Sequence, residues 1–189
     1  FDSEYYCEKL KIKCTRKSQK VVFRTSKGDL DVELFGQNNP VTVSNFILNI
    51  KNNIYNNKSF YKIINYPQVQ LIHSGVYTED TYYKKDNQNL NKLRTTIPLE
   101  IIFNNEIEPR YNYQFKYPNE KVNVKNTFEK GSLAMVKKGE INSSSTEFFF
   151  VTNKFPELDG RYSVFGKVVK GIEILDKIDK KDLIFEIII

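Results

Sequence analysis

Residues 21–34 alternate between apolar and polar side chains as a β-hairpin does. The run from Val21 to Thr25 is rich in residues that favour strands, and Ser26-Lys27-Gly28-Asp29 has the composition of a turn. Apolar residues then alternate with acidic ones as far as Leu34. The pattern predicts two strands around a tight turn.

The apolar spacing changes to that of a helix between Pro40 and Asn52. Apolar residues recur there on a single stripe, and Asn39 before Pro40 is a candidate N-cap with proline in the first turn. The stripe consists of Val43, Phe46, Ile47 and Ile50. We therefore expect one amphipathic helix directly after the hairpin.

The rest of the chain reads mainly as strands. One further short helical period covers residues 171–178, and no internal repeat is found. Many strands with few helices and short turns favour a closed or sandwiched antiparallel β architecture. The predicted strands are residues 60–64, 69–72, 131–136, 147–152, 162–169 and 183–189.

Two segments stand apart from this pattern. Residues 1–19 are polar and irregular, which indicates an N-terminal extension before a domain at 20–189. Residues 77–128 are long, polar and rich in Tyr, Asn and Lys, with one apolar island at 97–103. They contain too little apolar material for a core of their own, so we expect an excursion from the domain.

Composition narrows the class of protein. The 189 residues, 40% of them hydrophobic, suit one folded domain, and no apolar run reaches the roughly 18 residues of a membrane-spanning helix. Two Cys and one His are too few for a disulfide scaffold or a zinc centre, so we expect no metal and no cofactor. The net charge of +6 is spread along the chain, which does not favour a specific nucleic-acid partner.

The compartment is left open by the sequence. The chain begins at Phe1 and its single Met is Met135, so removal of an export signal is one explanation, and we lean towards a periplasmic or lumenal protein. Cys7 and Cys14 form a disulfide in an oxidising compartment or remain two reduced thiols.

Several motifs, in order, resemble the cyclophilin-type peptidyl-prolyl cis-trans isomerases. KGDLDVELF, PVTVSNFI and SFYKII are similar to that family's first hairpin, first helix and third strand. The more specific match is GSLAMV followed by STEFFFVTNKFPELDGRYSVFGKVVKGIEILDKI. The resemblance covers residues 20–180 apart from the excursion.

The family's fold and chemistry follow as expectations. The resemblance implies an eight-stranded closed antiparallel barrel capped by two α-helices, acting as a monomer on Pro-containing segments of unfolded or flexible proteins. Rotation about the X-Pro bond requires no metal or cofactor, because the site has only to bind proline and stabilise the twisted amide. In the family an arginine donates towards the prolyl nitrogen, and a glutamine and backbone groups hold the peptide.

The resemblance places these roles on particular residues. The arginine's position is Lys62, and the glutamine eight positions on is Gln70. The other peptide- and proline-binding positions fall on Pro67, Gln68, Val136, Lys137, Glu147, Phe149, Leu158 and Tyr162. Because neighbouring strand residues face opposite ways, Phe148 and Phe150 are expected in the core.

Lys62 is the main departure from the family pattern. Lysine offers a flexible point charge where arginine offers a planar fork, so we expect weaker catalysis than in close relatives. One hypothesis is that Glu147 holds the Lys62 ammonium across the cleft. The alternative to an enzyme is a non-catalytic peptide-binding or chaperone module on the same fold. His73 is expected to take no catalytic role with Ser74 and no metal.

Overall fold

The hairpin predicted at 21–34 is present as two neighbouring strands of the main sheet. In this computed structural model, which describes residues 2–76, 96–115 and 122–189, strands β1 (Gln19–Thr25) and β2 (Gly28–Leu34) pair in antiparallel register from Gln19–Leu34 to Thr25–Gly28. Alternate residues face the core, as the sequence predicts, with Phe23 and Leu30 fully buried. Gly28 has φ 126°, a conformation that a side chain disfavours.

Within the described residues, nine strands form one antiparallel sheet in the order β3-β11-β1-β2-β10-β8-β9-β5-β4. A separate pair, β6 and β7, lies within the predicted excursion. The remaining strands are β3 (Lys58–Ser59), β4 (Lys62–Asn65), β5 (Gln70–Ser74), β6 (Glu100–Ile101), β7 (Arg110–Tyr111), β8 (Ser132–Met135), β9 (Phe148–Val151), β10 (Val164–Lys170) and β11 (Leu183–Ile188).

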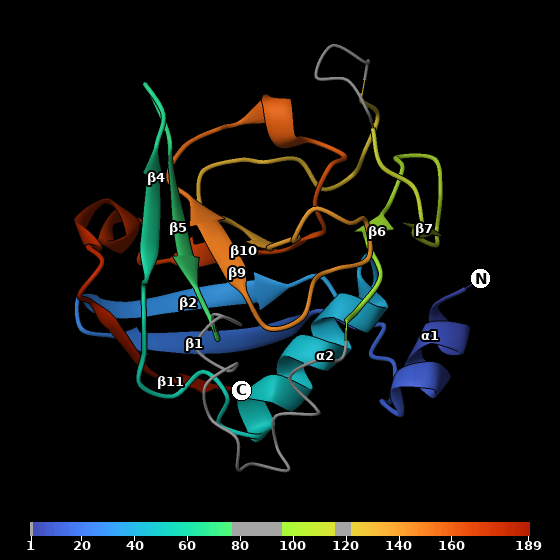
Figure 1. Ribbon diagram of the computed structural model, residues 1–189, viewed down its shortest axis with the longest axis horizontal. Helices are drawn as coiled ribbons and strands as arrows, with labels where there is room; N and C mark the ends of the chain where they lie inside the picture. Colours follow the sequence, from blue (N-terminus) through green and yellow to red (C-terminus); the bar gives the residue numbers. More distant parts are fainter. Residues whose placement is uncertain (1, 77–95, 116–121) are drawn as a thin grey trace.

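The sheet is curled into a half-barrel (Figure 1). β3 and β4 are its two outer strands, yet only Phe60 and Tyr61 separate them in sequence. Three residue steps reach at most about 11 Å, so the sheet must bend its edges towards each other. The edges do not pair, so the closed eight-stranded barrel expected from the resemblance is replaced by a half-barrel with one more strand.

The predicted first helix is present as α2 (Pro40–Lys51) and packs on the sheet. Phe46 lies 6.2 Å from Phe23 and 5.5 Å from Phe148, measured between ring centroids, and all three rings are fully buried. The Asn39 side chain does not cap this helix. The amide donors of Val41 and Thr42 are bound instead by the Glu100 carboxylate, at 3.0 and 2.8 Å.

Two further expectations about helices were wrong. The helical pattern predicted at 171–178 is a 3₁₀ helix, η2 (Ile172–Lys177), in place of a second α-helix. A shorter 3₁₀ helix, η1 (Pro156–Leu158), precedes it in the chain. The N-terminal segment also contains an α-helix, α1 (Ser3–Leu10), capped by the Asp2 side chain. No helix in the described ranges is both long and apolar enough to cross a membrane.

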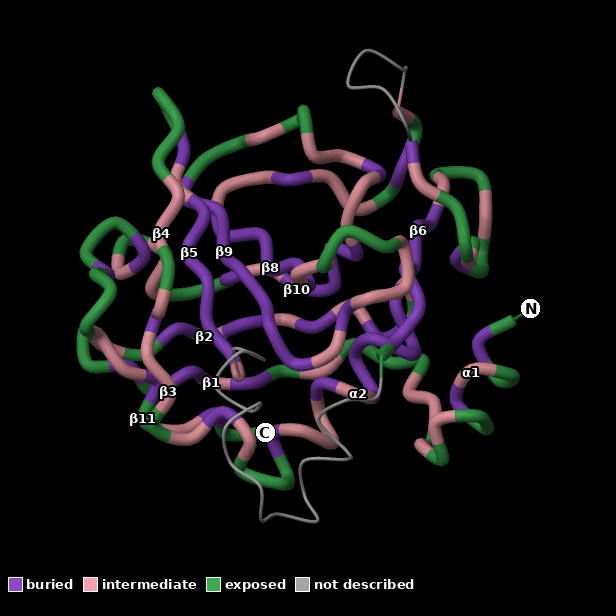
Figure 2. Tube along the Cα trace, in the orientation of Figure 1, coloured by how far each residue is buried: buried purple, intermediate pink, exposed green. Residues whose placement is uncertain are grey.

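The second half of the predicted excursion is built into the domain. Ile97 joins the main core, while Leu99, Ile101, Phe115 and Val124 form a small cluster of their own. Glu100 at the start of β6 is 1% exposed. Residues 96–103 therefore belong to the folded body, as their burial in Figure 2 shows, and residues 77–95 lie outside the described residues.

A disulfide joins Cys7 in α1 to Cys14 in the loop before β1. Replacing both cysteines by alanine is expected to lower the stability of this segment by about 2–3 kcal/mol, because the cross-link restricts the unfolded chain. Hydrogen exchange should show faster exchange of the α1 amides with little change in β1 and β2. Unchanged protection of α1 would mean that its packing alone holds it, including the Tyr6 ring 4.7 Å from that of Tyr111.

Candidate active site

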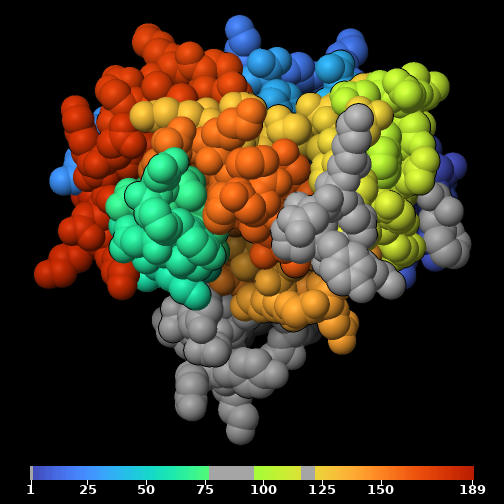
Figure 3. All heavy atoms as spheres, turned by 90° about the horizontal axis from the view of Figure 1, so that it is seen from above, coloured from blue at the N-terminus to red at the C-terminus, as the bar shows by residue number. Residues whose placement is uncertain are grey.

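A cleft of about 700 Å³ opens between the β4–β5 hairpin, β9 and the segment carrying η1. Figure 3 looks onto the face where the hairpin and the η1 segment lie side by side. The volume is in the range of pockets that enclose small ligands or side chains. The described residues that line it are Tyr61, Lys62, Ile64, Tyr66, Leu71, His73, Val136, Lys137, Lys138, Glu147, Phe149, Leu158 and Tyr162.

Phe149 forms the floor of the cleft because β9 alternates. Its neighbours Phe148 and Phe150 belong to the main core, as predicted, while Phe149 belongs to a second apolar cluster on the other side of the sheet. The Phe149 ring is stacked on Phe128 at 5.8 Å and meets Tyr162 edge-on at 5.5 Å. These contacts fix an aromatic surface that a proline ring can pack against.

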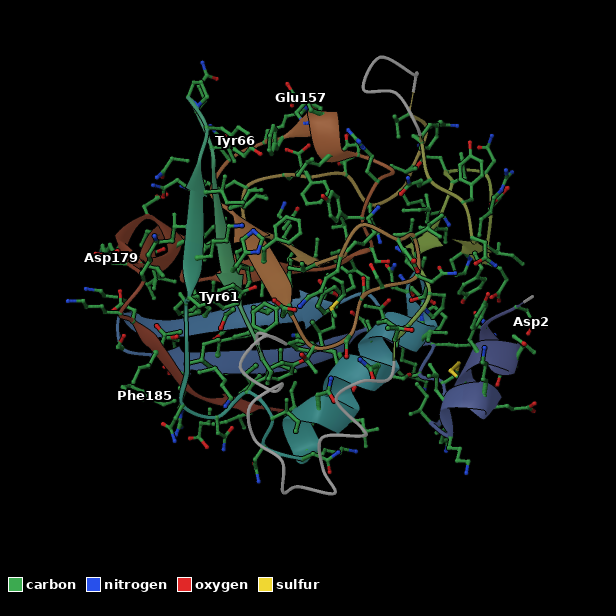
Figure 4. All side chains as sticks on the ribbon, in the orientation of Figure 1. Asp2, Tyr61, Tyr66, Glu157, Asp179 and Phe185 are labelled. Atoms are coloured by element: carbon green, nitrogen blue, oxygen red, sulfur yellow. A yellow bond between two sulfur atoms is a disulfide. The ribbon has the colours of Figure 1, made fainter. Side chains whose placement is uncertain are left out.

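The two sides of the cleft come from the hairpin and from η1. Leu158 of η1 is half-buried and lines the cleft, while Glu157 beside it is exposed. The Tyr66 ring lies 4.9 Å from Phe155 and bridges the hairpin tip to the segment before η1. Figure 4 shows Tyr66 at this tip, Tyr61 at the base of β4 and Glu157 on η1.

Lys62 lies on β4 at the edge of the cleft. Lys62 is exposed, and no carboxylate among the described residues forms an ion pair with its ammonium group. Its ammonium group is therefore free of a competing charge and can donate a hydrogen bond to a bound peptide.

The hypothesis that Glu147 holds Lys62 was wrong. Glu147 is 4% exposed, and its two oxygens are used by other groups. Lys138 Nζ lies 2.6 Å from Oε2, and the Tyr61 hydroxyl donates to Oε1 at 2.7 Å. Glu147 therefore anchors Tyr61 and Lys138 at the cleft.

Val136 and Lys137 follow β8 and close the cleft opposite the hairpin. The Lys137 ammonium donates to the Gln114 side chain at 2.5 Å and lies 4.9 Å from the centre of the Tyr162 ring. Burial, with a smaller effect of the nearby Arg161 charge, lowers the pKa of Lys137 from its usual value. Lys137 thus keeps Tyr162 in place against Phe149.

The structure does not bring Pro67, Gln68 and Gln70 into the cleft. Pro67 and Gln68 are exposed at the hairpin tip, where the Gln68 carbonyl accepts from the Asn153 side chain at 3.2 Å. The Gln70 amide group donates to the Asn65 side chain at 2.8 Å, and its backbone N–H donates to Thr152. The sequence match placed these three residues too close to the turn.

The register of the β4–β5 hairpin explains the difference. Ile63 pairs with Ile72 and Ile64 with Leu71, so the residue opposite Lys62 is His73, three positions beyond Gln70. Sequence reasoning therefore missed Leu71 and His73 as cleft residues. The sequence did contain a pattern that could have given the correct register. Pairing Ile63 with Ile72 and Ile64 with Leu71 places the turn between residues 66 and 69.

Fold and cleft together define a curled antiparallel β protein with an open cleft that has an aromatic floor. A family model described as "Cyclophilin type peptidyl-prolyl cis-trans isomerase/CLD" matches residues 20–184, and the chain belongs to this family. Its activity is peptidyl-prolyl cis-trans isomerisation, and the non-catalytic alternative is not favoured.

Curated relatives support the same activity. A peptidyl-prolyl cis-trans isomerase of Acinetobacter baylyi is 29% identical over 163 residues, covering 84% of this chain and 70% of that protein. Peptidyl-prolyl cis-trans isomerase-like 3 of Homo sapiens is 29% identical over 160 residues, covering 85% and 81% of the two chains.

Solved structures support the fold. A cyclophilin type peptidyl-prolyl cis-trans isomerase from Cryptosporidium parvum matches with a TM-score of 0.61 and 24% identity, over 91% of this chain and 97% of that one. A cyclophilin from Hirschia baltica matches with a TM-score of 0.63 and 16% identity, over all of this chain and 80% of that one.

Proposed function

We propose that this cleft isomerises X-Pro bonds in extended segments of unfolded or flexible proteins, with the proline ring on Phe149 and the Lys62 ammonium directed at the prolyl amide. One observation carries the proposal. The same cleft is lined by Phe149, whose ring is stacked on Phe128, and by Lys62, whose ammonium group has no ion partner among the described residues. An apolar surface selects proline, and a positive charge favours the twisted amide.

The physical task of the site is to lower a resonance barrier. Planar X-Pro amides interconvert slowly, with a barrier of about 20 kcal/mol, because the nitrogen lone pair is delocalised into the carbonyl. In the twisted form that lone pair becomes localised on nitrogen and accepts a hydrogen bond. A donor placed there stabilises the transition state more than either planar state, and this difference is what accelerates the exchange.

Partner and compartment follow as part of the same proposal. A monomeric working unit is part of the proposal. The Cys7–Cys14 disulfide supports an oxidising compartment, where such bonds persist. Flexible clients exposing X-Pro segments there would be the substrates.

The proposal is tested by cis/trans exchange of a tetrapeptide with a central Ala-Pro bond, measured by NMR. Leu158→Ala removes part of the apolar wall without touching the main core. It is expected to raise KM about fivefold to tenfold with a smaller effect on kcat, because lost packing on proline weakens both planar and twisted states. Leu48→Ala, at a half-buried leucine of α2 away from the cleft, is the matched control.

Either of two results would contradict the proposal. Absence of accelerated exchange by the wild-type chain, in spite of peptide binding, would leave a binding module in place of an enzyme. Equal losses in Leu158→Ala and Leu48→Ala would mean that general destabilisation, and not the cleft, controls the rate.

A further inference from the structure

A second groove, of about 420 Å³, lies between α2 and the loop that joins α1 to β1. Figure 1 shows this loop beside α2, on the side of the molecule where α1 lies. The groove and the cleft have no described lining residue in common. The loop side of the groove, residues 11–15, precedes the region 20–184 that the family model matches, so this groove is not a feature of the family domain.

Three contacts fix the loop side of the groove. Lys11 has a left-handed backbone conformation, φ 55°, which turns the chain at the end of α1. The disulfide joins Cys14 to Cys7 of that helix, and the Thr15 N–H donates to the Ser44 hydroxyl of α2 at 2.7 Å. The groove is therefore preformed, and a ligand that binds there does not have to order the loop first.

The floor of the groove is apolar. Ile12 from the loop and Ile47 from α2 are half-buried and pack against the main core. Leu48 is also half-buried and lines the groove, yet it belongs to none of the apolar clusters of the described residues. An apolar side chain of a partner that covered Leu48 would stabilise a complex, because both surfaces would be removed from water.

The rim of the groove is positively charged. Lys11 and Lys13 from the loop and Lys51 from the end of α2 line it, and all three are exposed. Among the described residues, none of these lysines forms an ion pair and no carboxylate lines the groove. A ligand that carries carboxylates on both sides of an apolar centre has the complementary charge.

The shape of the groove favours a segment of a protein over a lipid or a small anion. Sites for small molecules enclose most of the ligand, whereas this groove is open to solvent. A membrane surface is contacted by apolar side chains that project from a protein, but the apolar residues here are half-buried at the floor. A peptide segment can place apolar side chains in such a groove and keep its acidic side chains at the rim.

We propose that this groove is a docking site for an acidic, amphipathic segment of a partner protein. Its apolar side chains pack against Ile47 and Leu48, and its carboxylates lie beside the lysines of the rim. The inference does not depend on the proposed function of the cleft. Because the two sites have no described lining residue in common, a docked partner leaves the cleft open to an X-Pro substrate.

The test uses a defined probe. It is a fluorescein-labelled helical peptide of about 12 residues, with leucines on one face and glutamates on the other, titrated by fluorescence anisotropy at about 50 mM salt. One control peptide has lysine in place of glutamate, and a second has alanine in place of leucine. We expect the probe to bind and each control to bind at least about tenfold more weakly, because each lacks one half of the complementarity.

Variants of the chain locate the binding in the groove. The double variant Lys13→Glu/Lys51→Glu reverses two charges of the rim and is expected to weaken binding of the probe more than about tenfold. The loss should shrink as salt is raised, because exposed charges are screened. Leu48→Ala shortens the leucine of the floor and is expected to weaken binding about threefold to tenfold.

A matched control separates the groove from the net charge of the protein. Lys180→Glu/Lys181→Glu changes the net charge by the same amount at two exposed lysines. Their neighbour Asp179 lies on the opposite side of the molecule from Asp2 at the start of α1 (Figure 4). This double variant should bind the probe within about twofold of wild type. All variants should keep the unfolding temperature and the cis/trans exchange rate of the wild-type chain.

The outcomes separate this inference from the proposed function. Loss of cis/trans exchange with intact binding of the probe concerns the cleft alone. The docking site is overturned if the probe does not bind, if the control double variant weakens binding as much as the rim variant, or if Leu48→Ala binds as wild type does. Palmitate or phosphatidylserine vesicles that bind in preference to the probe, and lose binding in the same variants, would assign the groove to an anionic lipid and also overturn it.

Discussion

Lys62→Ala is expected to lower kcat for the Ala-Pro tetrapeptide about 100-fold while KM changes little. A charged donor that acts only on the twisted amide contributes to the transition state and hardly to ground-state binding, and removal of one such donor costs about 10²–10³ in rate in other enzymes. Lys62 lines the cleft opposite His73 and has no ion partner among the described residues, so its charge is available for this role. Exchange NMR and a separate peptide-binding titration measure the two quantities.

Two further variants make the Lys62 result specific. Lys20→Ala removes an exposed lysine of β1, away from the cleft, and should leave both constants unchanged. Lys62→Arg is expected to raise kcat above wild type, because the planar guanidinium presents fixed donors where the lysine chain is flexible. A Lys62→Ala rate within twofold of wild type would mean that the ammonium is a bystander and that binding geometry alone produces the acceleration.

Patterns that depend on local spacing could be predicted from the sequence. The β1–β2 alternation, the α2 stripe and the opposite faces of Phe148 and Phe149 all follow from strand and helix periodicity. Elements set by tertiary contacts could not. Residues 172–177 have helical spacing but form a 3₁₀ helix. The predicted strand at 60–64 begins only at Lys62, because at Phe60 and Tyr61 the chain crosses from β3 at one sheet edge to β4 at the other.

In the candidate site, too, local motifs predicted some residues correctly, and tertiary contacts placed others where the sequence did not predict them. Phe149, Leu158 and Tyr162 follow strongly matching motifs, and the structure brings all three into one cleft. The β4–β5 hairpin has no such motif in its turn, so its register depended on counting from Lys62, and an insertion there shifts every later position. The partners of Glu147 depend on tertiary contacts that the sequence does not show. Glu147 was expected to hold Lys62, but Lys138 and Tyr61 contact its carboxylate at 2.6 and 2.7 Å.

Glu100→Ala is expected to destabilise the protein by about 3–5 kcal/mol, because it leaves several buried donors without a partner at once. The Glu100 carboxylate accepts from the backbone N–H groups of Val41 and Thr42 and from the Tyr111 hydroxyl, whose oxygen also lies 2.8 Å from Ser3 Oγ. This one side chain joins β6 to the start of α2 and to β7, and Tyr111 continues the contact to Ser3 of α1. Denaturant unfolding measures the change, with Glu140→Ala, at an exposed glutamate, as the control, expected within about 0.5 kcal/mol of wild type.

The charge of Glu100 gives this role a pH dependence of defined sign. Burial raises its pKa above the ordinary value of 4.5, and its hydrogen bonds only partly oppose the shift. The folded state therefore holds this proton more tightly than the unfolded state, so the contribution of Glu100 to stability falls as pH rises from 4.5 through the folded pKa. Glu100→Gln cannot ionise, so wild-type stability relative to this variant should decline over that range. A difference that grew with pH would show instead that the three hydrogen bonds outweigh burial and favour the ionised carboxylate.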